Sequence, residues 1–331
     1  VAHSNRAREL VATPGAAWYG HDPGVLATAQ KALPRDVAVI EYIVLPERIA
    51  AWVIARDVFE ARILPASIGD VQRLLDGTSS RTSEPEFRSV MSALYTGLLA
   101  PLDDLLQETS SLVIVPDERL DRIPFAALYD PVTAQYVTQR RATTIAPSVA
   151  ACLQSTQRYA ERLTYGDRML VIDATEADAN RVALPDAARE ARSVSALYRD
   201  TRVLHGTAPA ALLSAAADST LIHFAGHGVG DDAAARELNL GTEEGTLQGR
   251  DVVNAFLPRT RLVYLSACAT DFGPVLKSEG SVTIARSFFA AGVRAVVATL
   301  WPVDDATARR IAHSFYERLR EGSSPADALR I

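Results

Sequence analysis

The sequence predicts an α/β fold, with a mostly parallel sheet covered by helices on both faces and a further α/β half before it. Ser219–Gly228 and Arg261–Thr270 are short apolar runs that stop in small residues, as buried parallel strands do. From Arg168 onward, such runs alternate regularly with helical segments. This alternation predicts parallel strands joined by helical crossovers.

Composition is typical of a globular protein that is large enough for two domains. The chain has 331 residues, of which 48% are hydrophobic and 22% charged, and its net charge is −6. An acidic balance argues against direct nucleic-acid binding. The sequence has no apolar run of membrane-spanning length and no apolar signal segment, so we expect a cytoplasmic protein without membrane contact. Because it starts at Val1 rather than Met, we expect a fragment or a processed form.

Cysteine and histidine spacing argues against disulfides and metals. Two cysteines, Cys152 and Cys268, cannot supply a disulfide framework for a chain of this length, and they form no zinc-type cluster. His223 and His227 are four residues apart, but they lie in a predicted strand and its exit loop, without the glutamate of a His-Glu-x-x-His motif. We therefore expect neither a metal nor another cofactor.

The first half begins with a helical connector over residues 1–35, which Pro34 ends. Val37–Val44 and Ile49–Arg56 are β-rich runs separated by four residues, which predicts a hairpin. Further elements expected here are strands at Phe59–Leu64 and Ser111–Pro116, helices at Ile68–Leu75 and within Glu86–Glu108, and a strand followed by a helix over Gln135–Cys152.

This half carries no reactive constellation of side chains. Arg140 and Arg141 either pair with acidic residues or mark a solvated strand end, and the solvated end is the interpretation we favour. Cys152 follows Val149 and two alanines in a predicted helix, so we expect a core thiol.

A polar segment, Gln154–Gly166, marks the expected boundary between residues 36–160 and 161–331. We place Glu190 and its neighbouring arginines on the outer face of a helix, and we expect His223 to be structural. Besides the two apolar runs, the strands expected after the boundary are Met169–Ile172, Arg202–Leu204 and Val293–Leu300. The expected helices are Leu184–Tyr198, Pro209–Ala217, one that begins at Arg250, Ser281–Ala291 and Asp305–Arg320. Leu238–Leu240 and Thr246–Leu247 are expected to form a hairpin.

His227 and Cys268 end the two apolar runs, and chemistry in open α/β sheets collects at the carboxyl ends of strands. A thiolate is the reactive form of cysteine, and a neighbouring imidazole favours it. The two residues are 41 positions apart, enough for a loop, a hairpin and a helix between adjacent strands. The backbone N–H groups of Gly228 and Cys268 are the natural oxyanion donors. The alternative is that both residues are structural.

Several motifs together resemble the CHAT domain, a caspase-like cysteine peptidase family of the separase, caspase and gingipain clan. They are HFAGHG, the Leu238–Val252 segment, VYLSACAT and SEGSVTIARSFFAAGVRAVVATLWPVDDATA. Segments upstream are also similar, among them VPDERLDRIPFAAL and LPDAAREA, so the resemblance runs from about Val25 to the C-terminus. One departure is Ser278 where the family commonly has glycine before Glu279-Gly280.

The resemblance implies a caspase-like fold with a dyad of His227 and Cys268, preceded by a pseudo-caspase half without catalytic residues. It also places a substrate pocket at Thr299–Asp305, in which Trp301 would be a wall and Asp304 or Asp305 would receive a basic side chain. Glu279 is grouped with this pocket. The alternative for both aspartates is helix capping.

These observations favour a cysteine endopeptidase that cleaves selected protein or peptide substrates. The resemblance implies control by a partner protein or by an upstream repeat domain, although the sequence itself has no visible repeat. The alternative is a signalling or scaffold domain whose dyad is silent until a partner binds. A Cys-dependent hydrolase of a small substrate has no supporting motif.

Overall fold

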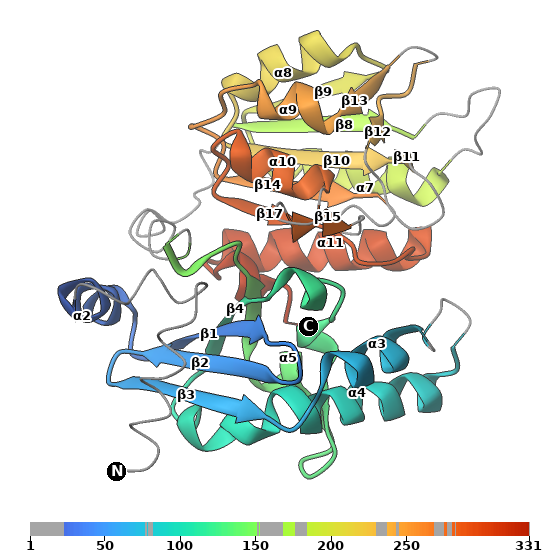
Figure 1. The fold of residues 1–331 in the computed structure, drawn as a ribbon. Coiled ribbons are helices and arrows are strands. Elements are labelled where there is room, and N and C mark those ends of the chain that lie inside the picture. The colour runs from blue at the N-terminus through green and yellow to red at the C-terminus, as the bar shows by residue number, and fades with distance from the viewer. Residues whose placement is uncertain are drawn as a thin grey trace. The chain divides into compact units, whose positions relative to one another are not determined.

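The computed structural model describes residues 23–76, 78, 82–150, 152, 168–175, 184–229, 237–242, 245–267, 275–276, 280–281 and 283–330. The chain forms two compact units, traced in Figure 1. Unit 1 comprises residues 1–161 with 330, and unit 2 comprises residues 162–329 with 331. No helix of the described ranges is long and apolar enough to cross a bilayer.

Unit 1 is built on a five-stranded mixed sheet in the order β3-β2-β1-β4-β7. The first three strands form an antiparallel meander, which confirms the predicted hairpin and its third strand. Strands β4 and β7 then add to β1 in parallel. The strand bounds are β1 Val37–Val44, β2 Ile49–Ala55, β3 Val58–Leu64, β4 Ser111–Val115 and β7 Ala142–Ile145.

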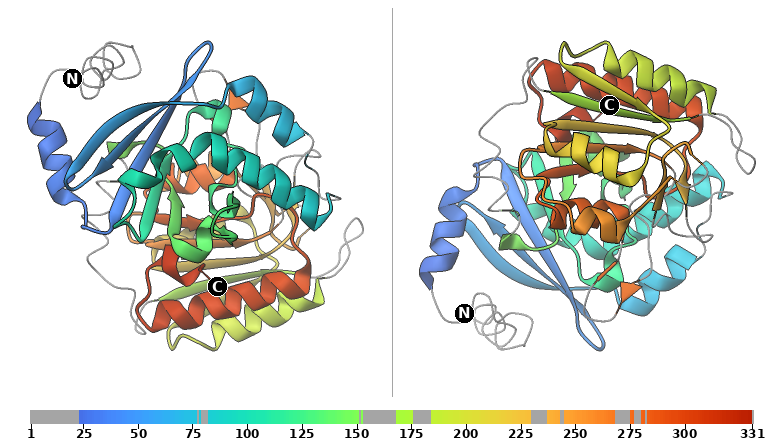
Figure 2. Two further views of the ribbon diagram at one scale, coloured as in Figure 1. Left: turned by 90° about the horizontal axis from the view of Figure 1, so that it is seen from below. Right: turned by 90° about the horizontal axis from the view of Figure 1, so that it is seen from above.

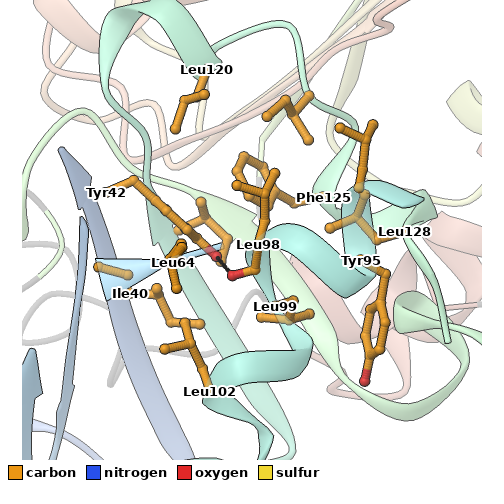
Figure 3. Close-up of a cluster of buried hydrophobic side chains, with 14 of the residues drawn as sticks. Ile40, Tyr42, Leu64, Tyr95, Leu98, Leu99, Leu102, Leu120, Phe125 and Leu128 are labelled. Atoms are coloured by element: carbon orange, nitrogen blue, oxygen red, sulfur yellow. Dashed lines mark hydrogen bonds between the residues drawn. The ribbon is translucent and has the colours of Figure 1, made fainter. Parts of the chain in front are cut away.

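Helices cover one face of this sheet with a continuous apolar core, part of which Figure 3 shows. Buried Tyr42 of β1 donates its hydroxyl to the carbonyl of Leu98 at 3.2 Å, which ties the sheet to α4. The helix predicted over Glu86–Glu108 ends earlier, because Pro101 cannot continue an α-helix, and a 3-10 helix follows. The bounds are α3 Ile68–Asp76, α4 Glu84–Leu98 and the 3-10 helix Ala100–Leu105.

The opposite face of the sheet is covered by a smaller apolar cluster. Leu26 of α2 (Pro23–Ala32) and Cys152 pack with Val39 and Ile54 of the sheet. Cys152 is 6% exposed, which confirms the predicted core thiol. The short elements elsewhere in unit 1 are the 3-10 turns Glu118–Leu120 and Phe125–Ala127, strands β5 Tyr129–Asp130 and β6 Gln135–Tyr136, and helix α5 Val137–Arg140.

Arg140 and Arg141 do not form a solvated strand end, so that prediction was wrong. Arg140 lies 3.0 Å from the buried carboxylate of Asp130. Arg141 is 8% exposed, donates to the carbonyl of Leu106 at 3.1 Å and lies 3.5 Å from Asp103. The end of the 3-10 helix leaves carbonyl groups without helical partners, and a guanidinium with five N–H donors satisfies them. The buried charge is therefore balanced by acids and carbonyls.

Unit 2 is built on a five-stranded sheet in the order β17-β14-β10-β8-β9, and every strand pair in it is parallel. This confirms the parallel sheet that the alternating pattern predicted. The strand bounds are β8 Met169–Ala174, β9 Thr201–His205, β10 Leu221–Gly226, β14 Leu262–Ser266 and β17 Ala295–Val297.

Helices cover both faces of this sheet, as predicted. In the right-hand view of Figure 2, α7 (yellow-green) and α11 (red) lie on one side, and α8 (yellow) and α10 (orange) lie on the other. The two cores match this division, because alternate residues of β8, β10 and β14 belong to one or the other. The helices are α7 Pro185–Ser195, α8 Pro209–Ala217, α9 Gly249–Val253, α10 Ile284–Ala290, α11 Asp305–Arg320 and α12 Pro325–Ala328.

Glu190 of α7 is fully buried, so its predicted place on the outer face was wrong. It shares the inward face with Ala187, Ala191 and Val194, at helical spacing. A carboxylate on this face is tolerated because His223 of β10, also fully buried, lies 3.1 Å from it. His223 is thus buried and structural, as predicted.

A small antiparallel sheet follows β10 in the chain, in the order β11-β12-β13. Strands β12 (Glu237–Asn239) and β13 (Thr246–Gln248) form the predicted hairpin. Strand β11 (Gly228–Val229) begins one residue after His227 and pairs with β12. A further two-stranded piece consists of β15 Val275–Leu276 and β16 Gly280–Ser281.

Candidate active site

The exits of β10 and β14 lie side by side at the carboxyl edge of the unit 2 sheet. Ala225 is paired with Ser266, 41 residues further along the chain, and His227 and Cys268 are separated by the same 41 residues. Cys268, like Glu279, lies outside the described residues. The register therefore brings together the two strands from which both predicted dyad residues follow.

The backbone of His227 is held by the small sheet. Its carbonyl accepts a hydrogen bond from the N–H of Asn239 at 3.1 Å, and the next residue, Gly228, is paired with Leu238. The His227 side chain is half-buried. In an antiparallel ladder this bond makes Gly228 and Leu238 a non-hydrogen-bonded pair, so the Gly228 N–H is directed away from β12.

Gly226, the last residue of β10, lies against β8. A Cβ at this position would be 2.8 Å from the carbonyl oxygen and 2.9 Å from the Cβ of Ala174, and 3.1 Å from the Phe224 ring. Two of these contacts are with a neighbouring strand that cannot move without breaking its own pairing. Glycine thus lets β10 and β8 approach closely one residue before His227.

We predict that Gly226→Ala lowers the free energy of unfolding by about 1–3 kcal/mol, because the added methyl group overpacks the contact with Ala174. Urea unfolding followed by circular dichroism measures the change. The matched control is Gly69→Ala in α3, where the nearest atom to an added Cβ is 3.8 Å away. A Gly226→Ala protein as stable as the wild type would contradict the close approach described here.

Three polar side chains that the sequence analysis missed lie at the same edge of the sheet. Asp173 near the end of β8 is 7% exposed and accepts a hydrogen bond from the Thr175 hydroxyl at 2.6 Å. His205 at the end of β9 lies 3.3 Å from Asp173 and is 64% exposed. The signal in the sequence was an apolar run, MLVI, that stops in Asp173. A buried acidic side chain therefore lies beside an exposed imidazole at this edge.

On the other side of β14, the segment that follows β17 is hydrogen-bonded to the segment that follows β14. The Thr299 hydroxyl donates to the carbonyl of Ala267 at 2.5 Å. β17 spans Ala295–Val297 and is shorter at both ends than the predicted strand Val293–Leu300. Trp301, the predicted pocket wall, also follows β17 and is 46% exposed.

Asp304 and Asp305 both make helix-capping contacts. Asp304 is the N-cap of α11 and accepts a hydrogen bond from the N–H of Thr307 at 3.0 Å. Hydrogen bonds from Thr307 hold the pKa of Asp304 below its ordinary value. Asp305 accepts from the N–H of Asp186 at 2.8 Å, so it caps α7. Asp186 in turn lies 3.2 Å from Arg309 of α11.

The described residues contain no group of three or more His, Cys, Asp or Glu side chains arranged to hold a metal ion. What this edge offers instead is an imidazole, a backbone N–H at Gly228, two acids at helix N-termini and the Asp173 carboxylate. Groups of this kind serve proton transfer and recognition of a polar or basic ligand.

The fold of unit 2, with a histidine at the carboxyl edge of a parallel sheet, defines the class of caspase-like α/β proteins. Solved structures with this fold include two of the Saccharomyces cerevisiae separase–securin complex. One matches with a TM-score of 0.60 and 11% identity over 92% of this chain and 29% of that chain. The other has a TM-score of 0.57 and 10% identity over 95% of this chain and 30% of that chain. At such identity the likeness concerns the fold alone.

The chain belongs to the CHAT domain family, whose model matches residues 88–331. Among curated relatives, Tetratricopeptide repeat protein 28 of Homo sapiens is 25% identical over 313 residues, which covers 77% of this chain and 12% of that protein. The Mus musculus protein of the same name is 25% identical over 321 residues, covering 79% and 13%. The chain therefore spans only a small part of the relatives it matches.

Proposed function

We propose that this chain is a cysteine endopeptidase in which His227 and Cys268 form the catalytic dyad. The observation that carries the proposal is the register of β10 with β14, whose offset equals the separation of the two residues. Membership of the CHAT family and a fold like that of separase support the class of enzyme.

In the proposed reaction, His227 accepts the thiol proton of Cys268, and the thiolate attacks the peptide carbonyl. The N–H groups of Gly228 and Cys268 stabilise the oxyanion, and the direction of the Gly228 N–H away from β12 supports this role. Protonated His227 then gives its proton to the leaving amine, and water hydrolyses the acyl-enzyme to regenerate the thiol.

The proposed substrate pocket is the region around Trp301, with acidic residues that select a basic side chain. Asp304, Asp305 and Glu279 are its proposed acids. Hydrogen bonds from Thr307 lower the pKa of Asp304, so this carboxylate keeps a negative charge while it caps α11.

Unit 1 is proposed as a non-catalytic pseudo-caspase half over residues 36–160, and residues 1–35 as a connector. Two side chains that follow β4 bind the backbone at the end of β1, at the carboxyl edge of the sheet, which supports this assignment. Asp117 accepts the N–H of Val44 at 2.9 Å, and Arg119 donates to the carbonyl of Val44. Burial opposes ionisation of Asp117, but hydrogen bonds from Arg119 and Val44 outweigh it and lower its pKa.

We further propose that a partner or an upstream repeat domain controls the peptidase. Two comparisons support this: a structural neighbour is a separase in complex with securin, and the relatives are named for tetratricopeptide repeats. A scaffold or signalling domain with a silent dyad is the competing outcome in the test below.

The test is covalent labelling by a peptidyl electrophile that carries a basic residue next to its reactive group. We expect the wild-type protein to be labelled at Cys268 and Cys268→Ala to remain unlabelled. The same electrophile with an acidic residue serves as the specificity control and should react more slowly. Mass spectrometry of the digested protein locates the label, since buried Cys152 offers an internal reference thiol. A wild-type protein that is not labelled at Cys268 would overturn the proposal in favour of a gated or silent domain.

A further inference from the structure

Three elements of unit 2 meet at one buried polar cluster beneath the sheet edge. Glu190 of α7, His223 of β10 and Tyr316 of α11 are each 0% exposed. His223 Nε2 lies 3.1 Å from Glu190 Oε1, and His223 Nδ1 lies 3.2 Å from the Tyr316 hydroxyl. The imidazole therefore contacts a helix through each of its nitrogens. These three residues are named the Glu190–His223–Tyr316 cluster below.

Aromatic rings enclose the imidazole. Tyr264 of β14 is the register partner of His223, with ring centroids 5.3 Å apart, and Tyr316 lies 5.5 Å away in an edge-on arrangement. Phe315 closes the group at 5.1 Å from Tyr264. Burial, together with the charge of Glu190, raises the pKa of both tyrosines above the ordinary value, so their hydroxyls stay protonated at neutral pH.

Burying polar and ionisable side chains in a core costs desolvation free energy. The carboxylate of Glu190 is at ion-pair distance from His223, but the contact is not aligned as a hydrogen bond, and Glu190 Oε2 has no hydrogen-bond partner among the described residues. Buried ion pairs add little net stability compared with apolar residues of the same volume. Their better-attested role is to fix one arrangement of the surrounding elements.

The cluster contacts the two strands that precede the proposed dyad residues. His223 and Tyr264 are paired on β10 and β14, the strands that lead to His227 and Cys268. Each lies four residues before its proposed dyad residue in the sequence. No substrate reaches the cluster, because its side chains are fully buried, so it cannot be a second catalytic site. Through the contacts of Tyr264 with His223 and Tyr316, the cluster can hold β10 and β14 in register.

We propose that the Glu190–His223–Tyr316 cluster braces the exits of β10 and β14 against α7 and α11, and thereby positions His227 for reaction with the Cys268 thiol. The cluster is a set of positioning residues. The part that concerns the thiol rests on the proposed function, whereas the position of His227 is measurable without it.

The test compares Glu190→Gln and Tyr316→Phe with a matched control, Phe315→Leu. The first two remove a charge or one hydroxyl at nearly constant volume, and the control perturbs packing on the same helix without touching the polar contacts. Labelling the six histidines with nitrogen-15 lets NMR follow the imidazole of His227 through a pH titration, with His227→Ala as the assignment control. Thermal unfolding of each protein is measured in parallel.

We expect Glu190→Gln and Tyr316→Phe to shift the His227 imidazole signals and to slow Cys268 labelling roughly 10- to 100-fold. Phe315→Leu should lower the melting temperature while the His227 signals stay at their wild-type positions. If the His227 signals are unchanged in both cluster variants, the cluster only packs the core and the proposal is overturned.

The outcomes separate this inference from the proposed function. A wild-type protein that is never labelled at Cys268 removes the peptidase proposal, and the NMR titration still decides whether the cluster positions His227. If Glu190→Gln fails to fold, Tyr316→Phe decides, since it removes a single oxygen atom. If the His227 signals of the cluster variants shift by no more than those of the Phe315→Leu control, the proposal is also overturned.

Discussion

Replacing His227 with alanine is expected to slow labelling of Cys268 by roughly 100- to 10,000-fold at neutral pH. The imidazole that follows β10 is the proposed acceptor for the thiol proton, and its loss leaves the thiol to ionise unaided. In the wild type, labelling should already be fast below neutral pH, because an imidazolium next to a thiolate stabilises it. In His227→Ala the midpoint of the pH–rate profile should rise toward about 8.5, the value of an ordinary cysteine.

A matched control comes from another histidine at the same edge. His205 ends β9 beside Asp173 and is 64% exposed, and two strands, β8 and β10, separate β9 from β14, so His205→Ala should change the labelling rate at Cys268 far less. Stopped-flow or quenched labelling across pH 5 to 10 separates the two variants. Equal losses in both, or a pH profile of His227→Ala that matches the wild type, would contradict a dyad at His227.

The largest loss of stability is expected from Phe224→Ala. Phe224 is 1% exposed and its register partners on either side, Ile172 and Leu265, are buried in the same core. Removing the ring leaves a cavity in the centre of the sheet's α8/α10 face, which the flanking strands cannot close. The expected cost is about 3–5 kcal/mol, a large part of the total stability of a domain.

Chemical denaturation of the whole chain measures this cost, and Phe256→Ala is the matched control. Phe256 is 80% exposed, so the same substitution there should change the free energy of unfolding by less than about 0.5 kcal/mol. Phe224→Leu should fall between the two, because it keeps most of the buried volume. A Phe224→Ala protein that unfolds at the wild-type denaturant concentration would show that the core face is assigned wrongly.

Most of the strand positions could be predicted because the apolar runs are continuous and end in small residues. The run from Leu221 to Gly226 is buried at every position. A strand that is buried on both faces is apolar throughout, so the ends of the apolar run mark the ends of the strand. The hairpin of β1 and β2 was predicted for a similar reason, since a short polar turn separates two β-rich runs. Local composition was sufficient for these elements.

Whether a charged residue is buried or exposed could not be predicted in the same way. Glu190 and Arg141 have sequence neighbours typical of solvent-facing positions, yet both are buried. Burial of a charge is tolerable only opposite a partner, and their partners, His223 and Asp103, are supplied by other elements. The contact of Asp305 with the N–H of Asp186 is another case, because it joins the starts of two helices 119 residues apart.

The sequence by itself determined the alternation of strands and helices and the family resemblance, and it put forward His227 and Cys268 as the candidate catalytic pair. Only the tertiary structure decided that these strands are neighbours in a register offset by 41 residues, and that a buried carboxylate, imidazole and phenol meet beneath them. Apolar runs and turn residues act locally, so they are visible in sequence. Register and charge burial depend on segments brought together by folding, and no local pattern encodes them.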